Sequence, residues 1–118
     1  MKIRIKRAYD KPEAGDGIRI LVERLWPRGL SKKNAKVDMW LKDIAPSTEL
    51  RKWYSHDPAK WKEFRKRYFQ ELNKNREAVK ELLDIAEGKD ATFVYGSKEE
   101  KYNSAAALKD YIENLGRP

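Results

Sequence analysis

The stretch "IRILVERL", residues 18–25, decides the fold of this 118-residue chain. Its apolar residues fall on both parities, with Ile18, Ile20 and Val22 on one and Leu21 and Leu25 on the other. A strand with one solvated face alternates apolar and polar residues, whereas a strand covered on both faces carries apolar residues on both parities. The stretch therefore predicts a central strand buried on both faces.

Patterns on either side of this strand predict the rest of an α/β domain. Residues 2–8 alternate charged and apolar side chains, which is typical of a strand near a sheet edge, and residues 91–95 form a short β-rich run. Three further segments carry stripes of apolar residues at helical spacing, which predicts three helices. These stripes are Trp61, Phe64, Tyr68 and Leu72; Val79, Leu82, Leu83 and Ala86; and Ala105, Leu108, Ile112 and Leu115.

Local signals place the ends of these helices. Ser47 or Thr48 can cap a short helix to Tyr54, Asp57 can cap the helix that starts at Pro58, and Asn103 can cap the last one. Gly88 is expected to end the second stripe, and Gly116 and Pro118 the third. We expect one small layered α/β domain over residues 1–118, with a short, mostly parallel sheet and helices packed on it.

The connection between the first two strands is the open point of this topology. Residues 10–17, "DKPEAGDG", concentrate Pro, Gly and Asp and predict a loop. Parallel neighbours usually need a longer crossover, so the sequence leaves a parallel and an antiparallel first pair open.

Composition excludes several classes of site and of protein. Without Cys there are no disulfides or thiolate metal sites, and a single His argues against a His-based metal centre. We find no P-loop or dinucleotide fingerprint and expect no cofactor. No apolar run has the length of a signal peptide or a membrane span, which predicts a soluble, cytoplasmic protein without a membrane partner. The charged fraction of 39%, rich in Lys and Glu, is typical of a thermophile's surface.

The net charge of +8 is concentrated in one part of the chain. Residues 1–36 carry 11 Lys and Arg against 4 Asp and Glu, a balance of +7, and the remainder carries 16 against 15. A local excess of this kind indicates a positive face for anions, although a solvated Lys-rich edge has the same composition.

The carboxyl ends of the predicted strands carry the candidate site residues. In open α/β sheets, ligands bind at these ends, so parallel strands would bring the groups together. The residues expected there are Arg7 and Tyr9 after the first strand, Glu23, Arg24, Trp26 and Arg28 after the central strand, and Ser97 and Asn103 after the last.

The central loop suits an anionic ligand. Arg24 and Arg28 could clamp a phosphate or carboxylate with their guanidinium forks, Trp26 offers a stacking surface, and Glu23 could act as a catalytic base or orient an Arg. The alternative is structural, with Glu23 paired to an Arg and Trp26 filling the core. If the strand continues to Glu23 and Arg24, these adjacent residues point to opposite faces, so one of them is expected to be structural.

Three long segments resemble a known family. "DGIRILVERLWPRGL" (16–30), "APSTELRKWYSHDPAKWKEFRKRYFQEL" (45–72) and "TFVYGSKEEKYNSAAAL" (92–108) are similar to the YeaO-like group of the domain-of-unknown-function family 488 (DUF488). The resemblance covers nearly the whole chain and implies an uncharacterised protein. It also implies Asp where Glu23 stands, and His where Ser104 stands. Glu23 keeps the carboxylate, whereas Ser104 removes a titratable imidazole.

The same resemblance draws attention to Arg51 and His56, each of which has a structural alternative. Arg51 could bind an anion or be buried against Trp53 and Tyr54, and His56 could serve the site or only pack beside the helix cap. Tyr9 could contact a ligand or lie at a rim, and Asn103 could be only an N-cap.

Three functional classes fit these observations. The first is a small enzyme or binding domain for an anionic, phosphate-bearing or nucleotide-like ligand. The second is a nucleic-acid-binding protein that uses the basic N-terminal third, although no helix-turn-helix or aromatic RNA-binding signature is present. The third is a protein-interaction module anchored by Arg and aromatic residues. The sequence does not fix the oligomeric state or decide whether there is catalysis.

Overall fold

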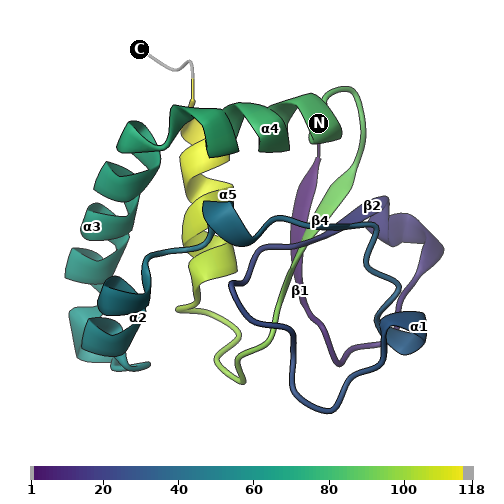
Figure 1. Cartoon of the computed structure of the whole chain (residues 1–118), viewed down its shortest axis with the longest axis horizontal. Coiled ribbons are helices and arrows are strands. Elements are labelled where there is room, and N and C mark those ends of the chain that lie inside the picture. The colour runs from purple at the N-terminus through teal and green to yellow at the C-terminus, as the bar shows by residue number, and fades with distance from the viewer. Residues whose placement is uncertain (1, 116–118) are drawn as a thin grey trace.

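Four parallel strands form the sheet of this protein, and helices pack on it (Figure 1). The computed structural model describes residues 2–115. The strands are β1 (Ile3–Arg7), β2 (Ile18–Leu21), β3 (Met39–Trp40) and β4 (Ala91–Tyr95), in the spatial order β1-β4-β2-β3. Phe93 of β4 lies in register with Ile5 of β1 and with Ile20 of β2. The predicted α/β class and mostly parallel sheet are confirmed, and β1 is an edge strand as expected.

The first connection joins two parallel strands, β1 and β2, despite its short length. β1 and β2 are not neighbours, because β4 lies between them and is parallel to both. The loop returns across one face of the sheet with a single 3₁₀ turn, Ala14–Asp16, in place of an α-helix. Gly17 has a φ of 64°, and a Cβ there would collide with the Asp90 carbonyl, so glycine lets the loop enter β2 close to the chain before β4.

β2 is the interior strand that the apolar pattern predicts, but it is shorter than residues 18–25. Ile20, Leu21 and Val22 are at most 1% exposed, and the Val22 N–H still donates to the Val94 carbonyl at 3.1 Å. The chain then leaves the sheet, and Leu25 is 69% exposed. The prediction of a buried Leu25 was therefore wrong, because the loop that carries it has no layer above it.

Five α-helices accompany the sheet. They are α1 (Lys32–Ala35), α2 (Thr48–Tyr54), α3 (Trp61–Lys74), α4 (Arg76–Ala86) and α5 (Ser104–Asn114). The caps are confirmed: Ser47 accepts from the Leu50 N–H, Asp57 caps the 3₁₀ turn that leads into α3, and Asn103 accepts from the Ala106 N–H. α1 and the two-residue β3 were not predicted, since neither is long enough to show a period.

The last helix ends earlier than its apolar stripe suggested. Leu115 follows α5 and is 40% exposed, so it does not belong to the inner face of that helix. The stop expected at Gly116 and Pro118 lies outside the described residues.

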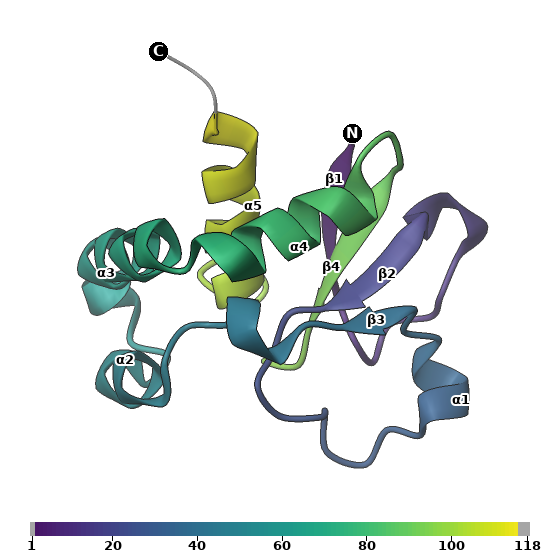
Figure 2. The same cartoon turned by 45° about the horizontal axis from the view of Figure 1, so that its top comes forward.

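The sheet has a separate apolar cluster on each face. α2 to α5 cover one face, where Phe64, Tyr68 and Leu82 pack against Ile20 and Phe93 of the sheet. On the other face, Leu21 and Val94 pack with Trp26, Leu30 and Trp40. Figure 2 shows α1 on the opposite side of the sheet from α3. This double cover explains why β2 carries apolar residues on both parities.

On the face of the sheet where Leu21 and Val94 pack, the end at which the strands begin is polar, and its charged side chains are paired. Asp16 accepts from Arg19 Nη1 at 2.6 Å and from Lys6 Nζ at 3.3 Å, and its carbonyl accepts from Thr92 Oγ1 at 2.7 Å. Arg19 also donates to the carbonyls of Ala35 and Lys36. We call Lys6, Asp16, Arg19 and Thr92 the amino-end cluster. Within residues 2–115, no helix has the length and apolar character to cross a bilayer.

Candidate functional site

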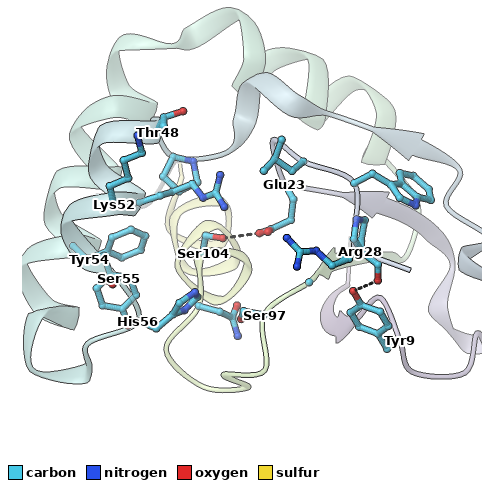
Figure 3. A pocket seen from close by; sticks show the side chains of 18 residues that line it. Tyr9, Glu23, Arg28, Thr48, Lys52, Tyr54, Ser55, His56, Ser97 and Ser104 are labelled. Carbon is cyan, nitrogen blue, oxygen red and sulfur yellow. Dashed lines mark hydrogen bonds between the residues drawn. The ribbon is translucent and has the colours of Figure 1, made fainter. Parts of the chain in front are cut away.

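A cavity of about 580 Å³ lies at the opposite end of the sheet, where β2 and β4 end. Three segments form its walls: the loop after β2, the region from Pro46 to His56 that contains α2, and the chain from Gly96 into the start of α5. These segments meet because the strands are parallel, so their carboxyl ends share one edge of the sheet. Figure 3 shows the side chains that converge there.

Glu23 lies in the middle of this cavity. Its Oε1 accepts a hydrogen bond from the Ser104 hydroxyl at 3.1 Å, and its backbone carbonyl accepts from Trp40 Nε1 at 2.7 Å. Burial raises the pKa of the Glu23 carboxyl above its usual value, and the Ser104 hydroxyl and the positive charges of Arg51 and His56 offset only part of this effect. A carboxyl group in a cationic cavity is therefore held by a single side-chain donor.

Two arginines line the same cavity as this carboxyl group, and they come from different walls. Arg28 comes from the loop after β2 and points into the cavity in Figure 3, and Arg51 comes from α2. Among residues 2–115, neither guanidinium group has a hydrogen bond or an ion pair to another residue. The Tyr9 hydroxyl donates to the Arg28 carbonyl at 2.7 Å, so Tyr9 holds the backbone of Arg28 at the rim.

The end of α2 brings His56 to the cavity. Ser55 and His56 have φ values of 46° and 56°, so two consecutive non-glycine residues adopt the left-handed conformation. Each such residue costs about 1 kcal/mol relative to an ordinary turn. The Ser55 N–H donates to the Arg51 carbonyl and closes the helix, and the turn directs the imidazole of His56 toward the cavity (Figure 3).

Aromatic and apolar side chains complete the lining. Trp26 Nε1 donates to the Leu30 carbonyl at 2.6 Å, and the Trp26 ring packs edge-on against Trp40 with 5.4 Å between ring centroids. This side chain therefore belongs to the apolar cluster around Leu21 and Val94 and also borders the cavity. Tyr54 stacks on Phe64 at 4.3 Å between ring centroids. Burial raises the pKa of Tyr54 to about 12, so its phenol stays neutral at ordinary pH.

Two of the predicted residues do not line the cavity. Arg24 donates to the carbonyls of Pro46 and Ala45 at 2.9 and 3.2 Å, and Arg7 donates to the Ser97 carbonyl at 2.9 Å. Both therefore tie wall segments together. Glu23 lines the cavity and Arg24 does not, although β2 ends at Leu21 and strand alternation does not extend to these two residues. The predicted clamp of Arg24 and Arg28 is therefore wrong, because Arg28 lines the cavity together with Arg51.

Ser97 and Asn103 line the cavity but are engaged locally. Ser97 Oγ donates to the Glu99 carbonyl at 3.3 Å, and Asn103 Nδ2 donates to the same carbonyl at 2.9 Å. Asn103 Oδ1 caps α5, so its structural alternative is sufficient to explain it.

Sequence reasoning missed further polar lining residues. These are Thr48, Lys52 and Ser55 of the α2 region, and Ser104 as the hydrogen-bond donor to Glu23. Thr48, Lys52 and Ser55 lie on the same face of α2 as Arg51, at spacings of three or four residues. This polar stripe could have indicated them from the sequence. No local signal pairs Ser104 with a residue 81 positions earlier. Residues 2–115 contain no cluster of His, Asp or Glu side chains suited to a metal ion.

Comparison with known proteins places the chain in a family. A family model described as "Inactive DUF488-N3 subclade" (DUF488-N3i) matches residues 2–116. The uncharacterised protein YeaO of Escherichia coli K12 is 43% identical over 98% of this chain and 100% of its own length. The uncharacterised protein Rv3073c of Mycobacterium tuberculosis H37Rv is 38% identical over 94% of this chain and 93% of its own length. No solved structure matches significantly. The predicted resemblance is confirmed, and the chain belongs to the DUF488 family, in its N3i subclade.

Proposed function

We propose that this protein binds a small phosphate-bearing ligand in the cavity at the carboxyl end of the sheet. The observation that carries the proposal is a pair of arginines, Arg28 and Arg51, that lie on two walls of one cavity and have no side-chain partner among residues 2–115. Guanidinium groups bind phosphate oxygens through two parallel hydrogen bonds, and two such groups can hold one phosphate from two sides. The N-terminal end of the α5 dipole adds positive potential at the same place.

The shape and lining of the cavity favour a ligand larger than phosphate itself. A volume of about 580 Å³ is in the range that metabolites and nucleotides occupy. Trp26, Pro27 and Phe64 provide apolar surface beside the cations, which suits the organic part of a phosphate ester. A sugar phosphate or a nucleoside monophosphate combines these two features.

Binding without turnover is favoured over catalysis. The matched family carries the description "inactive". The Tyr54 hydroxyl donates to the Tyr102 carbonyl at 2.7 Å, and the Ser104 hydroxyl donates to Glu23. Both hydroxyl groups are therefore engaged within the protein, so the arrangement suits recognition better than proton transfer.

The use of the basic residues also favours a pocket over an extended nucleic-acid surface. Five of the 11 cations in residues 1–36 donate to groups of the protein itself. These are Arg4, Lys6, Arg7, Arg19 and Arg24. Side chains already bound to carbonyls and carboxylates contribute little to contacts with a phosphate backbone.

Titration calorimetry with AMP and with ribose 5-phosphate tests the proposal. Arg28→Ala and Arg51→Ala should each raise Kd by about ten-fold or more, because each removes a charge-assisted contact. Arg76→Ala, which removes the same charge at the exposed start of α4, is the matched control and should leave Kd unchanged.

Two results would count against the pocket. One is an equal Kd for wild type, Arg28→Ala and Arg51→Ala. The other is tight binding of random single-stranded DNA that falls steeply with salt while AMP does not bind, which would support the nucleic-acid hypothesis instead.

A further inference from the structure

The carboxyl group of Glu23 presents one oxygen to the cavity. Ser104 donates to Oε1, and within residues 2–115 no other residue donates to Oε2. Every fully buried polar side-chain atom among these residues has a partner, so Oε2 is not fully buried. Because Glu23 lines the cavity, this oxygen is open to the space where a ligand would lie. It is a hydrogen-bond acceptor without an internal donor.

This acceptor lies in a cavity whose other charged groups attract anions. Arg28 and Arg51 would hold a phosphate, and the positive charge of Arg51 already acts on Glu23. A phosphate in that position and the Glu23 carboxylate carry the same sign and repel each other. A hydrogen-bond donor between them relieves this conflict, since one donor group satisfies the carboxylate and separates the two negative charges.

We propose that Glu23 selects phosphate esters that carry a hydroxyl group close to the phosphate and rejects esters that lack it. The inference rests on the proposed function and adds to it the part of the ligand that Glu23 recognises. A hydroxyl donor on the carbon skeleton contacts Oε2 while the phosphate contacts the two arginines. Figure 3 shows Glu23 with Arg28 on one side and Ser104 on the other.

The selection follows from what happens without the hydroxyl. A ligand that lacks a donor leaves a partly buried carboxylate facing a phosphate, with the water that solvated it displaced. Sites built to hydrogen-bond a substrate hydroxyl discriminate strongly against the analogue that lacks it for this reason. Glu23 is therefore a specificity residue.

Glycerol 3-phosphate and n-propyl phosphate form a matched pair of probes, because they share the phosphate and the three-carbon chain and differ in the hydroxyl groups. Calorimetry should show that the wild-type protein binds glycerol 3-phosphate at least about ten-fold more tightly. Glu23→Met keeps the length of the side chain and removes both the acceptor and the charge. It should reduce the preference to about three-fold or less, mainly by tightening the binding of propyl phosphate.

Ser104→Ala and Arg28→Ala separate the explanations. Ser104→Ala leaves Oε2 in place and should keep the preference, whereas loss of the preference in this variant would assign the effect to the Ser104 contact and overturn the role of Oε2. Arg28→Ala should weaken both ligands equally. Thermal unfolding establishes that each variant is folded, and Glu23→Gln replaces Glu23→Met if the latter is not, with a smaller reduction expected.

The failures of the two proposals are distinguishable. If Arg28→Ala weakens both phosphates and Glu23→Met leaves their ratio unchanged, the selection by Glu23 is overturned while the phosphate site stands. If neither phosphate binds to wild type, both proposals fail together.

Discussion

The two ends of the sheet each hold a carboxyl group among cations, and they treat it in opposite ways. At the amino end, Asp16 is 5% exposed and accepts from Arg19 at 2.6 Å, from Lys6 at 3.3 Å and from the Glu13 N–H at 3.1 Å. Burial alone would raise the pKa of Asp16, but these three donors outweigh it, and the pKa lies below its usual value. At the carboxyl end, Glu23 has one side-chain donor and a raised pKa.

The difference shows that the number of donors within the protein separates a structural cluster from a candidate site. In the amino-end cluster the opposite charges satisfy one another. At the carboxyl end Arg28, Arg51 and Glu23 face a cavity with unused hydrogen-bonding capacity. Such a site contributes less to stability than its charges suggest, as is common where residues serve binding.

Asp16→Ala should produce the largest effect on stability. It leaves Arg19, which is 4% exposed, with a buried charge that has lost its carboxylate partner. Removing one partner of a buried ion pair costs about 3 kcal/mol in the free energy of unfolding. Urea denaturation measures this loss. Asp84→Ala is the control, because its pair with Lys80 is exposed and should give no measurable change, and equal losses in the two variants would refute the contrast.

Glu23→Gln should stabilise the protein, in contrast to Asp16→Ala. Because the folded-state pKa of Glu23 is raised, its contribution to stability is complete below about pH 4.5 and is lost as pH rises through the folded-state pKa. At neutral pH the charged carboxylate therefore destabilises the fold, and the amide should raise Tm by about 2–5 °C. The gain should shrink as pH falls toward 4.5, the usual pKa of Glu.

Asp16→Asn provides the matched comparison for pH. The folded-state pKa of Asp16 is lowered, so its contribution is present above about pH 3.8 and is lost as pH falls through the folded-state value. Thermal unfolding of both amide variants between pH 3 and 8 should therefore show a loss of stability for Asp16→Asn and a gain for Glu23→Gln at neutral pH. A loss of Tm in both would contradict the difference between the two ends.

Tyr9→Phe should have the smallest effect. The Tyr9 hydroxyl is exposed and donates to the Arg28 carbonyl at 2.7 Å, so its removal should cost about 0.5 kcal/mol of stability. It should also raise Kd for ribose 5-phosphate by about two-fold, because the backbone of Arg28 loses a tether. Tyr111→Phe, which removes an exposed hydrogen bond to Asn73, should lose similar stability with no change in Kd. An unchanged Kd in Tyr9→Phe would remove this positioning role.

Elements with a strong local signal were predictable. The two-sided apolar pattern of Ile20 to Val22 predicted an interior strand, and the caps at Ser47, Asp57 and Asn103 were read from single residues. Features that depend on distant neighbours were not. Leu25 is exposed because no layer covers its loop, and β3 is held by pairing with β2 rather than by a pattern of its own.

The candidate site divides in the same way. Placing Glu23 and Arg28 at one strand end required only the rule for parallel sheets, whereas the family resemblance drew attention to Arg51 and His56; all four line the cavity. The exclusion of Arg24 required the positions of the Ala45 and Pro46 carbonyls, which the sequence does not give. The same holds for Ser104, whose contact to Glu23 depends on how α5 meets the end of β2.

The sequence by itself determined the layers of this protein, the order of its main elements and the strand end where its charges gather, because these follow from periodicity and from capping within a few residues. Only the tertiary structure decided which charged side chains have hydrogen-bond or ion-pair partners within the protein and which face the cavity without one. That distinction depends on donors and acceptors from segments far apart in the chain. Arg19 and Arg28 are chemically identical, and the carbonyls and carboxylate around Arg19 make it part of the framework, while Arg28 is left facing the cavity.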